Sequence, residues 1–101
     1  MLNQVIVVGR LAYDPEIREL ENGRKESYIT LACPRSYKNV DGVYDTDFIR
    51  CTLWNGIAEN TTEYCKKGDI VGVKGRLQRE EHGNLKIIAE KVNFLSSNKK
   101  E

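Results

Sequence analysis

Two aromatic residues and an arginine are separated by even numbers of positions in the segment from Asp47 to Trp54. If this segment is a β-strand, its side chains alternate between two faces, and Phe48, Arg50 and Trp54 share one face with Thr52. The two rings would then lie ~20 Å apart, too far to touch each other. Each ring could stack on a different unpaired base, with Arg50 reaching a phosphate or a base between them. The alternative is that both rings cover a subunit interface or a loop.

A third aromatic residue lies between two cations in the segment Arg35-Ser36-Tyr37-Lys38. On a hairpin tip, this ring could stack on a base or pack on its own hairpin. Other cations on predicted strands could contact phosphates, although a single charge on a strand can also be merely solvated. The residues predicted to bind nucleic acid are Arg10, Arg35, Tyr37, Lys38, Phe48, Arg50, Trp54, Lys74 and Arg76.

The elements that must position these side chains are mostly strands. Runs rich in β-branched and apolar residues predict five of them, over residues 3–11, 25–33, 46–54, 70–78 and 85–95. Asn22-Gly23, Asp41-Gly42 and Gly83-Asn84 predict hairpin turns between strand-like runs. Pro34 is expected to end the second strand because it cannot donate to a ladder, and Gly9 indicates a bulge or bend in the first.

One segment has helical rather than strand periodicity. Ile57, Thr61, Tyr64 and Cys65 recur at the spacing of a helix with one buried stripe, and Asn55 could cap its start. Three strands, a short helix and two further strands are the layout of an all-β protein, a five-stranded antiparallel OB-fold barrel with one helix between strands three and four. We expect one domain over residues 1–95 and a frayed end over 96–101.

Composition excludes several other classes of protein. The 101 residues carry 16 Lys and Arg against 15 Asp and Glu, which is neither a histone-like polycation nor an acidic disordered chain. No apolar run approaches the length of a membrane span and no signal peptide is visible, so a cytoplasmic protein is expected. An apolar first strand and a small core favour pairing with further copies of the chain.

The reactive side chains do not form a recognisable catalytic or metal site. The three cysteines, Cys33, Cys51 and Cys65, contain no close pair and fall on apolar faces, which predicts core residues rather than a disulfide or a zinc site. His82 is the only histidine and is expected to be exposed in a hairpin. No phosphate-binding loop occurs either. We therefore expect no enzyme, no cofactor and no metal.

An ordered series of short motifs resembles the bacterial single-stranded DNA-binding protein family from about residue 2 to 95. The series is NQVIVVGRL, DPEIR, ITLA, TLW, AE followed by Tyr64, KGD and VKGRL. The resemblance implies an OB-fold that oligomerises, usually as a homotetramer, and wraps single-stranded DNA without sequence preference in replication, recombination and repair. The family's base-stacking aromatics match Tyr37, Phe48 and Trp54, and its third-strand cation matches Arg50.

The sequence departs from the family pattern in two places. The last hairpin is short and holds His82 where the family often carries an aromatic, which implies a weaker grip on DNA there. The family's acidic, hydrophobic tail tip is missing, so tail-mediated recruitment of replication or repair proteins is not implied. Two other functions fit the same predicted barrel: a protein-interaction module in a replication-restart assembly, and an RNA-binding OB domain.

Overall fold

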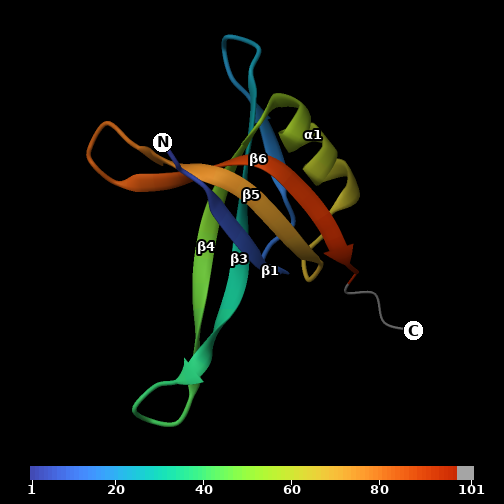
Figure 1. The fold of residues 1–101 in the computed structure, drawn as a ribbon. Coiled ribbons are helices and arrows are strands. Elements are labelled where there is room, and N and C mark those ends of the chain that lie inside the picture. Colours follow the sequence, from blue (N-terminus) through green and yellow to red (C-terminus); the bar gives the residue numbers. More distant parts are fainter. Residues whose placement is uncertain (98–101) are drawn as a thin grey trace.

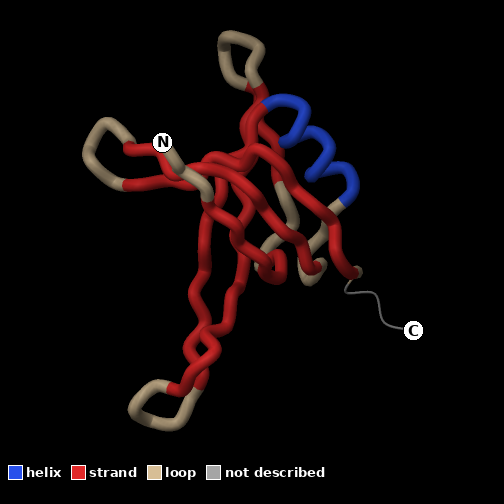
Figure 2. Tube along the Cα trace, viewed as in Figure 1, coloured by secondary structure: helices blue, strands red, loops and turns tan. Residues whose placement is uncertain are grey.

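Six strands and one helix form the computed structural model, which describes residues 1–97 (Figures 1 and 2). They are β1 (Val5–Leu11), β2 (Glu16–Glu19), β3 (Lys25–Lys38), β4 (Tyr44–Trp54), α1 (Asn55–Tyr64), β5 (Ile70–Arg79) and β6 (Leu85–Ser96). Of the segment expected to fray, Ser96 still pairs with Ile70, and residues 98–101 lie outside the described residues.

The strands close into a barrel with the topology expected of an OB-fold. The sheet order is β1-β5-β6-β4-β3-β2, and an additional pairing of β1 with β3 closes β1, β3, β4, β5 and β6 into a ring. The expectation that every pairing is antiparallel was wrong for β4 and β6, which run parallel, with Cys51 opposite Ile87 and Thr52 opposite Ile88. After the β5–β6 hairpin, β6 runs beside β4 in the same direction as β4. This parallel pairing completes the barrel.

The short strand β2 was not predicted from the sequence. Residues 16–19 pair antiparallel with Lys25 to Tyr28 on the edge of β3. All four of its side chains are exposed, so no hydrophobic alternation marks the strand in the sequence. Its turn does contain the predicted Asn22-Gly23 pair, and Gly23 has a φ of 81°.

The barrel interior contains the alternate apolar residues of the strands. In β4, Cys51 and Leu53 are fully buried, as the alternation predicted. Burial raises the pKa of the Cys51 thiol to about 11, which keeps it protonated and unreactive at neutral pH. Cys65 is also buried, whereas Cys33 is half-buried, and all three thiols are free.

The helix α1 follows β4 and precedes β5 in the chain, as expected, and it packs against β2, β3, β4 and β6, but its details differ from the prediction (Figure 1). Thr61 and Cys65 are buried, whereas Tyr64 is 68% exposed and lies outside the buried stripe. Asn55 does not cap the helix with its side chain. Its amide oxygen instead accepts a hydrogen bond from the Lys25 backbone N–H at 3.1 Å, which ties the start of the helix to β3.

The hairpin between β3 and β4 projects from the barrel as a long arm, visible in Figures 1 and 2. Pro34 does not end β3 as expected. It pairs with Thr46 next to an irregularity in register, after which Lys38 pairs with Tyr44. Beyond Ala32, β3 pairs with β4 alone among the described strands, and proline is tolerated at such edge and bulge positions.

Gly9 allows the barrel to close and does not mark a bulge. The β1–β5 ladder is regular through this residue. A Cβ on Gly9 would lie 2.8 Å from the Cys33 sulfur and 2.9 Å from the Ala32 carbonyl oxygen. The absence of a side chain therefore lets β1 reach β3 at this point. Within residues 1–97 no helix is long and apolar enough to cross a bilayer.

Candidate nucleic-acid interface

One face of the β3–β4 pair gathers the residues that the sequence singled out. The register places Trp54, Thr52, Arg50 and Phe48 opposite alternate residues of β3, and residues opposite each other share a face. We call these eight residues the β3–β4 outer face: Glu26, Tyr28, Thr30, Ala32, Phe48, Arg50, Thr52 and Trp54. Phe48 is 64% exposed on this face, Arg50 is exposed and Trp54 is half-buried. The outward orientation predicted for Phe48 therefore agrees with the structure.

Thr52 and Glu26 depart from the rest of this face because they are only 3% and 7% exposed. Thr52 lies within β4, between Arg50 and Trp54. It is the point at which β4 pairs with both β3, through Tyr28, and β6, through Ile88. Neighbours on both sides cover a short side chain there. The β3–β4 outer face is therefore covered at Thr52, and the accessible side chains of β4 lie on either side of it, at Arg50 and Trp54.

Three cations lie over aromatic rings on this surface. The Arg50 guanidinium carbon lies 3.8 Å from the centroid of the Tyr28 ring, and that of Arg24 lies 4.2 Å from the Trp54 ring. On the arm, the Lys38 ammonium lies 5.7 Å from the ring of Tyr44, which alternates onto the same side of β4 as Phe48. Such pairs combine flat surfaces with positive charge, as single strands require.

The sequence pattern does not single out Arg24, Tyr28 or Tyr44 as binding residues. Arg24 follows a turn and lies 30 positions before Trp54, so only the β3–β4 register reveals their contact. Tyr28 is exposed between the buried Ser27 and Ile29 of β3, but nothing in the sequence pairs it with Arg50. Cross-strand register is the missing information in each case.

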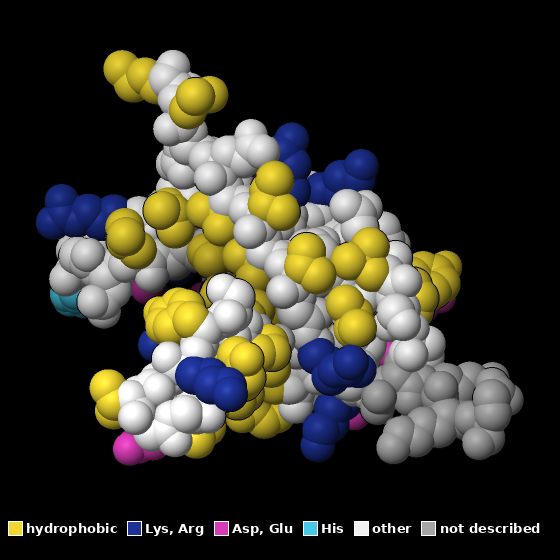
Figure 3. All heavy atoms as spheres, turned by 60° about the horizontal axis from the view of Figure 1, so that its bottom comes forward, with side chains coloured by type: hydrophobic (Ala, Val, Ile, Leu, Met, Phe, Trp, Pro, Cys, Tyr) yellow, Lys and Arg dark blue, Asp and Glu magenta, His cyan; other side chains and the backbone are white. Residues whose placement is uncertain are grey.

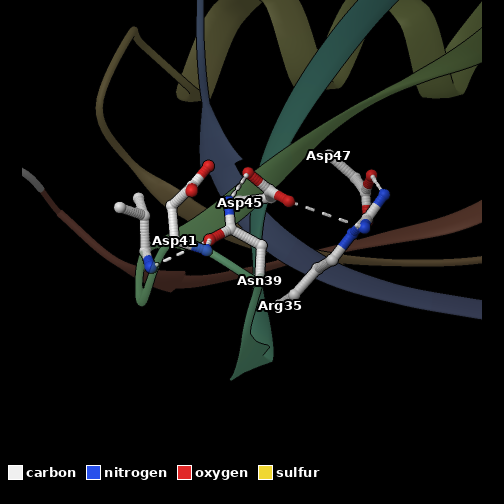
Figure 4. Close-up of polar contacts among 6 residues, drawn as sticks. Arg35, Asn39, Asp41, Asp45 and Asp47 are labelled. Atoms are coloured by element: carbon white, nitrogen blue, oxygen red, sulfur yellow. Dashed lines mark hydrogen bonds and ion pairs between the residues drawn. The ribbon is translucent and has the colours of Figure 1, made fainter.

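Arg35 lies on the opposite side of the arm from Phe48, in a cluster of polar side chains (Figure 4). Its Nε and Nη2 donate to the two carboxylate oxygens of Asp47 at 3.1 and 2.9 Å, and Asp45 lies 3.8 Å away. The hydrogen bonds with Asp47 raise the pKa of Arg35 and lower that of Asp47. Asp47 alternates with Phe48 along β4, so this pair faces away from the β3–β4 outer face.

The tip of the arm is fixed by Asn39. Its side-chain oxygen accepts hydrogen bonds from the backbone N–H groups of Asp41 and Val43 at 2.8 and 3.0 Å, and its amide nitrogen donates to Asp45 (Figure 4). Tyr37 is 62% exposed. It precedes Lys38, whose partner is Tyr44, so alternation directs its ring toward the Arg35 side of the arm.

The remaining predicted cations lie away from the β3–β4 outer face. Arg10 donates to the Gly68 carbonyl oxygen at 2.7 Å, at the end of β1. Lys74 and Arg76 are on β5, where Arg76 lies 3.5 Å from Glu90 and 3.2 Å from the Gln78 side chain. The structure therefore brings together Phe48, Arg50 and Trp54 and separates them from these three cations.

A buried carboxylate fixes the position of Tyr28. Glu26 is 7% exposed, accepts a hydrogen bond from the Tyr28 hydroxyl at 3.0 Å and pairs with Arg18 of β2 at 2.6 Å. Burial acts to raise the pKa of Glu26, but the hydrogen bonds from Arg18 and Tyr28 outweigh it, and the pKa is lowered. The carboxylate is therefore ionised at neutral pH, and it anchors the ring on which Arg50 stacks.

We expect Glu26→Gln to lower the free energy of unfolding by about 1–2 kcal/mol at pH 7, because it weakens two hydrogen bonds to a charged acceptor. A lowered folded-state pKa stabilises the fold above the unfolded-state value of ~4.3, and this contribution is lost as pH falls through the folded-state value. Urea unfolding of both proteins should therefore show a difference at pH 7 that shrinks below pH ~4. A difference that is the same at both pH values would contradict this role for Glu26.

A groove of about 340 Å³ lies between this face and the β5–β6 hairpin. Tyr28, Arg50 and Thr52 form its β3–β4 wall, and the other wall consists of Glu80, Asn84, Leu85 and Lys86. The described residues bring together no group of three His, Cys, Asp or Glu side chains that could hold a metal ion. The groove thus offers a cation–π stack, an apolar side chain and hydrogen-bonding groups, which suit a flat polar ligand such as a base.

The barrel topology, with a helix between its third and fourth barrel strands, defines this chain as an OB-fold protein. Its sequence matches the model of the single-strand binding protein family over residues 2–95. The chain belongs to that family.

Relatives from several bacteria agree with this assignment. The chain is 40% identical to single-stranded DNA-binding protein B of Bacillus subtilis, over 100% of this chain and 96% of that protein. It is 42% identical to a single-stranded DNA-binding protein of Halalkalibacterium halodurans, with 94% of this chain and 61% of the relative covered. It is also 43% identical to single-stranded DNA-binding protein 3 of Listeria innocua, over 96% of this chain and 66% of that protein. The chain thus spans nearly all of the first relative and about two thirds or less of the other two.

Proposed function

We propose that this chain binds single-stranded DNA without sequence preference through the β3–β4 outer face and protects it in replication, recombination and repair. The observation that supports this most strongly is the set of exposed or cation-stacked rings along one side of β3 and β4. Rings of this kind stack on any base, because every base has a π-face, while the cations neutralise phosphates. A duplex hides its base faces and should bind far more weakly.

The bound DNA strand would run along β4 from the Trp54 end toward the arm. It would meet the Arg24–Trp54 pair first, then the Tyr28–Arg50 pair, then Phe48 and Lys38. Tyr37 could be reached by a strand that turns round the arm tip. Three further contacts, to Arg10, Lys74 and Arg76, require the strand to continue round the barrel. Arg35 would have to exchange Asp47 for a phosphate, so we expect it to contribute least.

The test of this function is a titration of intrinsic fluorescence with oligo-dT at two ionic strengths, with a hairpin duplex as control. We expect saturable quenching of Trp54 and an affinity that falls with salt, at a slope of about −0.7 for each phosphate neutralised on a single strand. Quenching by oligo-dT that is no stronger than quenching by the duplex would contradict the proposal. Insensitivity to salt with no oligonucleotide binding would favour the protein-interaction alternative, and tighter binding of matched RNA would favour the RNA-binding one.

We also propose that the chain forms a homo-oligomer, a tetramer by analogy with the family, through the outer side of β1, β5 and β6. Ile6, Val8 and Leu95 are 67%, 55% and 54% exposed there, and they line a shared depression with Gly72 and Lys74. Figure 3 shows hydrophobic side chains spread over the middle of one face with Lys and Arg around them. Within the described residues, β1 pairs only with β5 over Val5–Gly9, which leaves an edge for a second copy. Light scattering that gives a monomer at micromolar concentration would contradict this proposal.

The biological setting follows from the same proposal. Residues 1–95 would form the DNA-binding domain, and the protein would work on the nucleoid in the cytoplasm. No part of the binding mechanism above requires a cofactor or a metal ion.

A further inference from the structure

The groove between the β3–β4 outer face and the β5–β6 hairpin contains two charged side chains, Glu80 and Lys86, of which the Lys86 ammonium also helps to lower the pKa of the buried Glu26 carboxyl. Glu80 and Lys86 line the same wall of this groove, together with Asn84 and Leu85. Among residues 1–97, neither the Glu80 carboxylate nor the Lys86 ammonium has a hydrogen-bond or ion-pair partner. The backbone around them is ordered by hydrogen bonds between Glu80 and Asn84 at 2.7 Å and between Gly83 and Glu80 at 2.9 Å.

A carboxylate is unexpected on a surface that binds a polyanion. It repels phosphate, so it weakens a purely electrostatic contact. A carboxylate accepts hydrogen bonds and cannot donate them, so its natural partner on a nucleic acid is an N–H group of a base. Glu80 therefore indicates that a base edge, rather than a phosphate, occupies this groove.

Arg50 supplies the surface on which such a base would stack. One face of its planar guanidinium is covered by the Tyr28 ring at 3.8 Å. Arg50 is exposed and lines the groove, so the other face is available to a base, and guanidinium planes are established stacking partners of bases. The parallel β4–β6 pairing sets Ile87 beside Cys51, which brings the preceding residues, Lys86 and Arg50, to the same level.

Guanine has the hydrogen-bonding pattern that fits these groups best. Its N1–H and N2–H₂ are adjacent donors on one edge and can bind both oxygens of one carboxylate, whereas adenine, cytosine and thymine offer no such pair on that edge. Its O6 and N7 are adjacent acceptors, which suit an ammonium. The Glu80 carboxylate can only accept hydrogen bonds and the Lys86 ammonium can only donate them. Glu80 therefore complements the N1–H and N2–H₂ donors of guanine, and Lys86 complements its O6 and N7 acceptors.

We infer that this groove is a guanine-preferring subsite within an otherwise sequence-independent surface, with Glu80 and Lys86 as the groups that recognise the base. The inference rests on the proposed binding of single-stranded DNA, since it selects one base along that strand. In oligo-dT, a single guanine placed in the correct register would bind this groove, and the neighbouring thymines would occupy the stacking rings.

The test uses oligo-dT strands in which one residue, scanned along the strand, is replaced by guanine, hypoxanthine or adenine. Hypoxanthine lacks only the N2 amino group of guanine, and adenine controls for purine stacking. We expect guanine at the best position to bind about fivefold to tenfold tighter than thymine, hypoxanthine to lose most of this gain, and adenine to show none. Equal affinities for guanine, hypoxanthine and adenine at every position would overturn the inference.

Two variants with the same change of charge separate recognition from electrostatics. Glu80→Gln should abolish the guanine preference, measured for each protein as the ratio of its affinities for the guanine-containing strand and for oligo-dT. Glu81→Gln, next to it in the hairpin but outside the groove lining, should keep the preference. A guanine preference that survives Glu80→Gln would overturn the assignment. If unsubstituted oligo-dT does not bind at all, the proposed function itself fails, and this outcome is distinct from binding without preference.

Discussion

Phe48→Ala should weaken the binding of oligo-dT by about 1–3 kcal/mol, the contribution of one base stacked on an aromatic ring. Phe48 is 64% exposed and has no cation over its ring among the described contacts, so both its apolar area and its π-face are open to a base. Removal of the ring leaves no cavity in the core, and the free energy of unfolding should change little. Fluorescence titration measures the affinity, and circular dichroism shows that the variant is folded.

Matched variants identify stacking as the cause. Phe48→Tyr keeps the ring and should bind almost normally, whereas Phe48→Leu keeps an apolar side chain without the ring and should lose most of the affinity. Tyr64→Ala removes an equally exposed aromatic from α1, away from the β3–β4 outer face, and should bind like the wild type. Equal losses in the Phe48→Ala and Tyr64→Ala proteins would show that the binding face is assigned wrongly.

Gly75→Ala should lower the free energy of unfolding by about 3 kcal/mol or more, a large part of the stability of a small domain. Gly75 is buried where the β5–β6 register shifts between Lys74 and Gly75. A Cβ there would overlap the Ile88 carbonyl oxygen and lie 3.0 Å from the Ile88 carbonyl carbon. These are backbone atoms of the neighbouring strand, so they cannot move aside without disturbing the barrel.

Gly72→Ala is the matched control in the same strand. Its Cβ would lie 3.5 Å from Leu95 and 3.6 Å from Val8, which are ordinary contacts with side-chain atoms. We expect its stability to equal or slightly exceed that of the wild type, because alanine restricts the unfolded chain more than glycine does. Urea unfolding of the two variants should separate them clearly. Similar stabilities would mean that β6 does not pack against Gly75 as described.

Much of the fold could be predicted because its signals are local. The alternation from Phe48 to Trp54 correctly separated the buried Cys51 and Leu53 from the exposed Phe48 and Arg50. Turn glycines marked the hairpins, and Gly42 and Gly83 have φ values of 76° and 92°. These patterns depend on the backbone near each residue and not on the rest of the chain.

Other features depended on contacts between distant segments. The parallel β4–β6 pairing, the strand β2 and the continuation of β3 through Pro34 are set by neighbouring strands, which the sequence does not specify locally. The same reason explains why the sequence grouped binding-site candidates that the structure places on different sides of the arm. Tyr37 was selected because it lies between Arg35 and Lys38 on a predicted hairpin, but the irregular register of the arm and the Arg35–Asp47 pair direct Arg35 and Tyr37 to the side away from Phe48.

The central claim is that single-stranded DNA lies on the β3–β4 outer face, and photo-crosslinking tests it most directly. Oligo-dT in which single thymines are replaced by 5-iododeoxyuridine would be bound to the protein, irradiated and mapped by mass spectrometry. We predict crosslinks to Phe48, Trp54 and Tyr28. Crosslinks concentrated on exposed aromatics elsewhere, such as Tyr13 or Phe94, with none on β3 or β4, would contradict the account.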